Sequence, residues 1–178
     1  MRTTMYFVDV DESVASYATV TDFIKIFIDE MPSLYLLSLL LTGDHVKAEL
    51  CFICALEECV AEIGILRACM SSWARQAIIR HAIQLIMPVP WQVNGFSFIG
   101  LEAIEKLREN NYFGAIRALG AFERFVYIMT ILEGWSEQKS ALRLRCARRD
   151  VMMARVLALN WVAGVDAANS QGEKALCI

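Results

Sequence analysis

The sequence has little of what enzyme active sites are usually built from. Its two histidines, His45 and His81, have no nucleophile and acid at a fixed spacing beside them. Its nine glycines are scattered along the chain, so no glycine-rich phosphate loop is present. The adjacent glutamates Glu57 and Glu58 point to different sides of a helix and are typical of a solvated face. The sequence therefore predicts a protein that is not an enzyme and that binds no cofactor.

Long hydrophobic runs and a secretion signal are also missing. The longest apolar run, Leu34 to Leu41, is interrupted by Ser38 and is far shorter than the roughly 18 residues of a membrane span. Residues 1–12 end in acidic side chains and contain no apolar stretch of the kind found in signal peptides. We therefore expect a cytoplasmic protein without a membrane span.

Six cysteines are present, and their spacing raises the question of a metal site. Cys51, Cys54 and Cys59 lie within an unbroken helical pattern that lacks the turn residues of a zinc knuckle. Buried cysteine behaves as a small hydrophobic residue, and cytoplasmic proteins rarely form disulfides. The favoured interpretation is structural burial without a metal, and a metal site is the alternative.

Apolar side chains are abundant: they make up 57% of the chain, at a mean hydropathy of +0.43. This supplies a sizeable core and indicates that a partner covers part of the surface. The net charge of −3 is unevenly distributed. Residues 1–62 carry three basic and eleven acidic groups, whereas residues 139–155 carry six basic groups and one acid, a local net charge of +5. Such a basic stretch favours binding to nucleic-acid phosphates.

Apolar residues recur at helical spacing along the chain, and no stretch alternates in the manner of a β-strand. The sequence therefore predicts an all-α protein. Pro32 suits the first turn of a helix, Gly43 a helix end and Asp44 a helix N-cap. We expect helices over residues 22–31, 33–41, 45–61, 66–86, 101–108, 113–119, 122–132, 137–144 and 147–162.

Proline and glycine gather between residues 88 and 100, which marks the best domain boundary in the chain. We expect two small helical domains joined by this Pro/Gly-containing linker, the second domain being a helix-turn-helix. The predicted segments are an acidic N-terminal stretch (1–21), a helical domain (22–87), a linker with a short helix (88–112), a helix-turn-helix domain (113–165) and a flexible tail (166–178).

A stretch near the C-terminal end has the spacing of two short helices that cross closely. Ser136 is a candidate N-cap, Ala141 and Leu144 share one helical face, and Val151 is the first buried position of the next helix. A turn at Arg145–Ala147 separates the two helices, as in a helix-turn-helix. The side chains that the second helix would expose are Arg148, Arg149, Met152 and Arg155. The alternative is a solvated surface helix whose arginines have no special role.

Two ordered blocks of sequence stand on either side of the predicted linker. The first runs from Phe23 to Tyr35 and continues into Leu41-Thr42-Gly43-Asp44. The second runs from Leu119 to Tyr127 and is followed by Leu132-Glu133-Gly134 and the helix-turn-helix positions. These blocks resemble regions two and four of bacterial RNA polymerase sigma factors of the extracytoplasmic-function class. The resemblance covers about residues 22–86 and 113–162.

This resemblance implies a sigma-like protein that binds core RNA polymerase through its N-terminal helical domain and promoter DNA through its C-terminal helix-turn-helix. The implied polymerase-binding residues are Ala48, Glu49 and Phe52. The implied DNA-binding residues are Arg143, Arg145, Arg148, Arg149, Met152, Arg155, Arg75 and Arg80. Arginine suits this role because it contacts phosphates and guanine edges bidentately.

The chain departs from the family pattern at several positions. Arg145 stands where the family has the turn glycine, and Ala147 stands where it has a small polar cap. Apolar side chains are expected to face outward at Leu50, Ile53, Met152 and Met153. The alternative function is therefore a diverged sigma-like interaction module that binds a copy of itself or an anti-sigma-type regulator.

Overall fold

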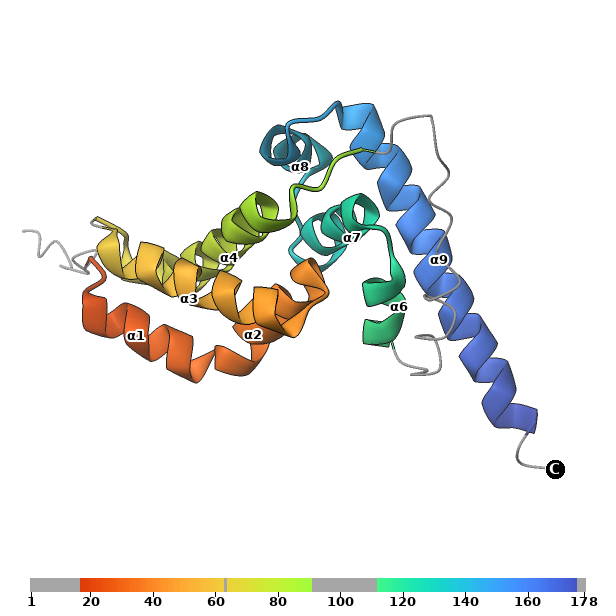
Figure 1. Ribbon diagram of the computed structural model, residues 1–178, viewed down its shortest axis with the longest axis horizontal. Coiled ribbons are helices and arrows are strands. Elements are labelled where there is room, and N and C mark those ends of the chain that lie inside the picture. The colour runs from red at the N-terminus through yellow and green to blue at the C-terminus, as the bar shows by residue number, and fades with distance from the viewer. Residues whose placement is uncertain (1–16, 63, 91–111, 176–178) are drawn as a thin grey trace, which may run out of the picture.

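A computed structural model describes residues 17–62, 64–90 and 112–175, with side chains described as far as Val165 (Figure 1). Apart from an isolated bridge between Tyr17 and Leu66, these residues contain no β-structure, and the predicted all-α class is confirmed. The elements are α1 (Val20–Asp29), α2 (Met31–Thr42), α3 (His45–Ala61), the 3-10 turn η1 (Arg67–Cys69), α4 (Met70–Ile86), α6 (Tyr112–Ala118), α7 (Ala121–Tyr127), the π-helix η2 (Ile128–Leu132), α8 (Glu137–Leu144) and α9 (Arg148–Ala175).

The first helices begin and end close to where the sequence predicts. Thr19 caps α1 in a capping box: the Asp22 N–H donates to the Thr19 hydroxyl, and the Thr19 N–H donates to the Asp22 carboxylate. Gly43 ends α2 with a φ of 72°, a conformation that strains any residue with a side chain. Asp44 then caps α3 by accepting the Lys47 N–H at 2.9 Å. These caps fix the boundaries of three successive helices.

Helices α1 to α4 form the N-terminal half, in which α2, α3 and α4 pack on one another (Figure 1). The buried face of α3 is made of small side chains at helical spacing, namely Ala48, Cys51, Ala55 and Cys59. Because these side chains are small, α3 approaches α2 and α4 closely. Larger side chains such as Leu37 of α2 and Ile78 of α4 fill the space between the helices.

In the C-terminal half, α6, α7 and α8 pack along the long helix α9 (Figure 1). The buried face of α9 consists of Val151, Ala154, Ala158 and Val162, which recur every three or four residues. Partly buried Trp161 adds a polar link, because its indole N–H donates to the Ala115 carbonyl of α6 at 3.1 Å.

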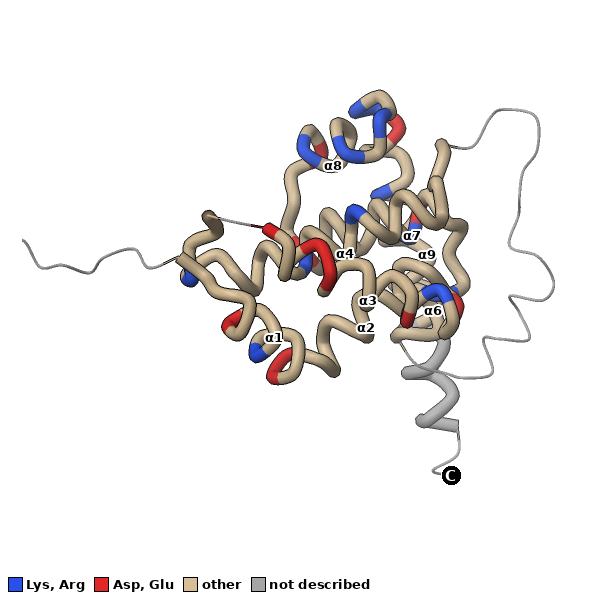
Figure 2. Tube along the Cα trace, turned by 60° about the vertical axis from the view of Figure 1, so that its left-hand side comes forward, with Lys and Arg blue, Asp and Glu red and all other residues tan. Residues whose placement is uncertain are grey.

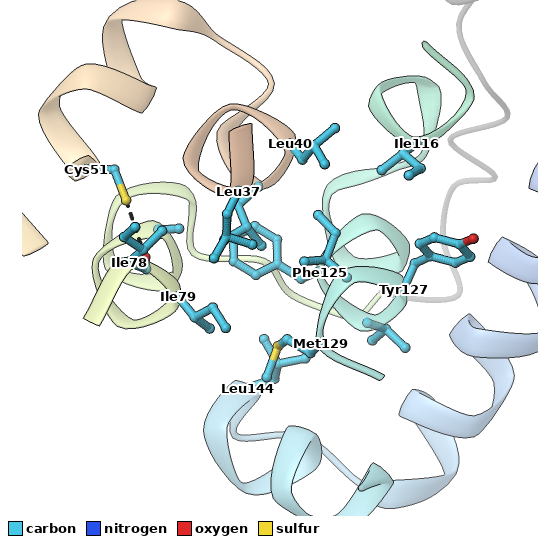
Figure 3. Close-up of a cluster of buried hydrophobic side chains, with 14 of the residues drawn as sticks. Leu37, Leu40, Cys51, Ile78, Ile79, Ile116, Phe125, Tyr127, Met129 and Leu144 are labelled. Atoms are coloured by element: carbon cyan, nitrogen blue, oxygen red, sulfur yellow. Dashed lines mark hydrogen bonds between the residues drawn. The ribbon is translucent and has the colours of Figure 1, made fainter. Parts of the chain in front are cut away.

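The two halves pack against each other and share one hydrophobic core. The core runs from Leu37 and Ile79 in the N-terminal half to Phe125 and Met129 in the C-terminal half (Figure 3). Buried Arg124 of α7 donates across the boundary to the Leu41 carbonyl at 3.2 and 3.3 Å. The division into two domains stays a prediction, because most of the predicted linker, residues 91–111, lies outside the described range.

Two helices differ from the prediction. The sequence predicts an end near residue 162, but α9 continues to Ala175, so the predicted end of this helix is wrong. Gly164 lies inside α9 and does not end it. One glycine destabilises a helix by only about 1 kcal/mol relative to alanine. The helix predicted over 122–132 becomes a π-helix at Ile128–Leu132, where the Thr130 hydroxyl donates to the Val126 carbonyl at 2.7 Å.

Two further predictions, the helix over residues 101–108 and the acidic stretch as far as residue 16, lie outside the described range. Within that range, no helix has both the length and the apolar character needed to cross a membrane.

Candidate nucleic-acid interface

Helices α8 and α9 are joined by the predicted three-residue turn. The Ser136 hydroxyl caps α8 by accepting the Lys139 N–H at 3.2 Å. Ala141 and Leu144 of α8 and Val151 of α9 are buried where the two helices meet. Two helices separated at residues 145–147 are therefore present where the sequence predicts them.

Arg145 ends α8 in the left-handed conformation, with a φ of 53° and a ψ of 46°. Its own N–H and that of Cys146 bond back to carbonyls in the last turn of α8, the latter to Ala141 at 3.1 Å. This is the geometry for which helix ends normally use glycine. Arg145 therefore adopts a turn conformation in which glycine is the usual residue.

The start of α9 has no side-chain cap, since Ala147 carries no polar group. Asp150, three residues later, accepts the Ala147 N–H at 3.3 Å. Its carboxylate also lies near the positive end of the helix dipole, which is favourable. Asp150 thus satisfies one backbone N–H at the start of α9 in place of a side chain at position 147.

Most of the basic residues predicted to bind DNA lie on α8, the turn and the first turns of α9 (Figure 2). We define the basic surface as Arg143, Arg145, Arg148, Arg149, Met152 and Arg155. Arg149 is the most exposed of its ion-paired arginines, with 86% of its side chain accessible, against 60% for Arg148 and 40% for Arg155. The predicted outward position is confirmed for Arg148, Arg149 and Met152, whereas Arg155 is partly buried.

Glu137 belongs to the candidate interface, although no pattern in the sequence indicated it. Its carboxylate pairs with Arg148 at 3.0 Å and with Arg155 at 3.2 Å. Counted over residues 137–155, six basic and two acidic groups give a net charge of +4 rather than +5. The pairing joins residues 11 and 18 positions apart, so no helical spacing could have indicated it.

Arg75 and Arg80 of α4 are bound to glutamates. Arg75 donates to Glu133 at 2.9 Å through its Nε, in a cluster that links α4 to the segment after the π-helix. Arg80 pairs with Glu58 of α3 and lies over the ring of Trp73, 4.9 Å from its centre. These arginines serve internal contacts, and they are not exposed like Arg149.

The structure nevertheless brings Arg80 close to the basic surface. A groove of about 1070 Å³ lies between the C-terminal end of α4, the segment after it and α8. We call this the α4–α8 groove. Its basic lining residues are Arg80, Lys139, Arg143 and Arg145, and none of the described residues that line it is acidic.

The predicted polymerase-binding residues of α3 are not all exposed. The expected outward position of Ala48 is wrong: it is fully buried, because it belongs to the small-residue face against α2 and α4. Phe52 is partly buried and contacts Phe27 edge to face, with ring centres 5.2 Å apart. Glu49 is exposed and stays a predicted polymerase contact.

Cys51 (Figure 3) and Cys59 are buried, as the sequence predicts, whereas Cys54 is only partly buried. The Cys51 thiol donates to the Ile78 carbonyl at 3.3 Å, and burial raises the pKa of Cys51 and of Cys59 to about 12. In the described parts of the chain, no three His, Cys, Asp or Glu residues are grouped as metal ligands.

Comparison of the chain with protein-family models, with curated proteins and with solved structures gives no match. A proposal for its function therefore depends on its own residues and their arrangement.

Proposed function

We propose that the chain is a sigma-factor-like transcription protein. In this proposal the basic surface binds promoter DNA, and the N-terminal half binds core RNA polymerase. The observation that carries it is the pair of helices α8 and α9, which meet at a tight turn and expose arginines at the start of the second helix. In a helix-turn-helix, the start of the second helix is the part that reaches base edges.

The exposed arginines differ in how readily they can reach DNA. Arg149 has only a 3.5 Å contact to neighbouring Asp150, so its guanidinium is available for phosphate or guanine. Arg148 and Arg155 must first break their ion pairs with Glu137 before they can contact DNA. Such a partly exposed ion pair is worth no more than about 1 kcal/mol, so exchanging the carboxylate for a phosphate costs little.

DNA binding is tested with variants of the most exposed arginines. We expect Arg148→Glu with Arg149→Glu to abolish binding, because phosphate contacts supply most of the affinity. The milder Arg149→Gln should lower the slope of log affinity against log salt concentration by about 1. Fluorescence anisotropy with duplexes selected from a randomised library measures both effects.

The matched control is Lys47→Gln, which removes one exposed positive charge from α3, outside the basic surface. It should leave DNA affinity unchanged, and circular dichroism should show the same helix content in all variants. Full DNA binding by the Arg148→Glu, Arg149→Glu double variant would contradict the assignment of α9 as the recognition helix.

Polymerase binding is tested separately, by co-elution of the chain with core RNA polymerase on size exclusion. Glu49 is exposed on α3, so Glu49→Lys should weaken co-elution by reversing the charge of the predicted contact. Absence of co-elution by the unaltered chain would contradict the polymerase part of the proposal and leave the DNA part standing.

A second candidate function, self-association or binding of a regulator, is favoured by the outer face of α9. Residues 156–165 contain no charged side chain, and large apolar side chains stand exposed there. They are Val156, Leu157 and Leu159, and exposed Met152 and Met153 precede them on the same helix. Such a face is typical of a helix that a partner covers.

Sedimentation equilibrium tests self-association through this face. If α9 forms a dimer, Met153→Glu with Leu157→Glu should give a monomer with unchanged helix content. A chain that is already monomeric at high micromolar concentration would exclude self-association through α9.

A further inference from the structure

The α4–α8 groove combines unpaired positive charge with exposed apolar side chains. Arg80 is neutralised by Glu58, but in the described part of the chain no carboxylate pairs with Lys139, Arg143 or Arg145. Within the described residues these three cations therefore face the groove without a carboxylate partner, and the Lys139 amine also lies over the Trp135 ring, 3.7 Å from its centre. They attract a ligand that carries a matching number of negative groups.

The apolar lining of the groove favours one class of negatively charged ligand over others. Met87, Val89 and Leu142 line it and are 72%, 71% and 71% exposed. A nucleic-acid backbone offers few apolar groups to cover such side chains. A peptide that is both acidic and hydrophobic satisfies the two kinds of lining residue together.

We propose that residues 5–12 of this same chain dock in the α4–α8 groove. The segment reads Met5-Tyr6-Phe7-Val8-Asp9-Val10-Asp11-Glu12 and lies outside the described range. Its three carboxylates match the three unpaired cations in number, and its five apolar residues match the exposed apolar lining.

The segment is long enough to reach the groove. The chain is held at Ala18, whose N–H donates to the Ile65 carbonyl at 2.7 Å, and at the bridge between Tyr17 and Leu66. From there α4 leads to the groove, which lies over its second half; its 17 residues span about 26 Å. The eight residues from Tyr17 back to Asp9 cover a similar distance when extended, about 26–29 Å.

Docking would cover Arg143 and Arg145 of the basic surface. The segment would therefore compete with DNA, and this consequence rests on the proposed DNA-binding function. The docking itself does not depend on it. Because the segment belongs to the same chain, its effective concentration at the groove is high even if its intrinsic affinity is weak.

Carbodiimide cross-linking of the full chain tests the docking directly. The reagent joins a carboxylate to an amine as an amide, with loss of water, so it should link Asp9, Asp11 or Glu12 to the exposed amine of Lys139. Peptide mass spectrometry locates the link. We expect Arg143→Glu with Arg145→Glu to suppress it, since both substitutions repel the segment and leave Lys139 in place.

Exposed Lys25 and Lys47 provide the matched control, because they report random contact with the same carboxylates. Links to these lysines as frequent as links to Lys139 would overturn the proposal. A link that forms only between differently isotope-labelled chains would also overturn it, by placing a second copy's segment in the groove.

DNA affinity separates this inference from the proposed function. Asp9→Asn, Asp11→Asn and Glu12→Gln together should suppress the link and raise DNA affinity about tenfold, by removing an intramolecular competitor. A Lys139 link in a chain that binds no DNA would support the docking and overturn the DNA function. DNA binding by a chain that forms no Lys139 link would support the DNA function and overturn the docking.

Discussion

Arg124 is a buried arginine that touches the ends of two helices. Its guanidinium donates to the carbonyls of Leu41, Arg117 and Leu119, which lie at the ends of α2 and α6. Such carbonyls lack partners within their helix and carry partial negative charge. Burial lowers the pKa of Arg124, and the charge of Arg117 acts in the same direction, yet a guanidinium stays protonated in proteins. Arg124 thus caps both helices with one charge.

We expect Arg124→Met to lower the free energy of unfolding by about 2–3 kcal/mol, because the buried carbonyls lose their donor. Urea denaturation measures the change. The control Arg149→Met removes an arginine whose side chain is 86% exposed and should change stability by less than about 0.5 kcal/mol. Equal stability of Arg124→Met and the unaltered chain would contradict the capping role.

The buried thiols give a second prediction at this scale. Burial raises the pKa of Cys51 and Cys59 to about 12, so at pH 8 about one thiol in ten thousand is ionised. Iodoacetamide at pH 8 should therefore label exposed Cys69 and leave these two unmodified until urea unfolds the chain. Labelling of Cys51 in the native protein as fast as Cys69, seen by mass spectrometry, would show that the N-terminal half opens readily.

At the scale of elements, the turn between α8 and α9 makes a prediction about strain. Arg145 has a φ of 53°, which costs a residue with a Cβ about 1–2 kcal/mol. Arg145→Gly should therefore raise the free energy of unfolding by about 0.5–1 kcal/mol, after allowing for glycine's greater freedom in the unfolded chain.

The matched substitution is Arg143→Gly, which removes the same charge from a regular position of α8 and should lower stability by about 1 kcal/mol. Both variants should weaken DNA binding to a similar degree. A loss of stability in Arg145→Gly, measured by urea denaturation, would mean that the arginine side chain holds the turn through contacts beyond its backbone.

Most helix boundaries were predictable because their signals are local. Gly43, Asp44 and Ser136 act on backbone groups within a few residues, and each acts as predicted. The continuation of α9 to Ala175 and the π-helix at Ile128–Leu132 were missed. A π-helix depends on how a segment packs, which helical periodicity does not record.

Features of the candidate site that depend on one helix could be predicted from the sequence. Features that depend on how several segments pack together could not. The outward arginines of α9 follow from helical spacing alone. The pairing of Glu137 with Arg148, and of Glu133 with Arg75, requires the packing of distant segments. Ala48 is likewise buried because its face of α3 packs against neighbouring helices. The small residues that recur every three or four positions along that face were the signal in the sequence.

At the scale of the whole molecule, the ion pair of Arg75 and Glu133 joins the two halves. Its side chains are 30% and 8% exposed, and hydrogen bonding to Glu133 raises the pKa of the Arg75 guanidinium. Removing one partner leaves the other charge partly buried. We expect Arg75→Met and Glu133→Gln each to lower the free energy of unfolding by about 2 kcal/mol.

A double-mutant cycle shows whether the two residues act on each other. The double variant should lose about 1–2 kcal/mol less than the sum of the single losses, because the second substitution removes the charge that the first one left unpaired. Urea denaturation followed by tryptophan fluorescence and by circular dichroism measures all four proteins. Additive losses would mean that the pair contributes no coupling, and that the shared apolar core alone holds the halves together.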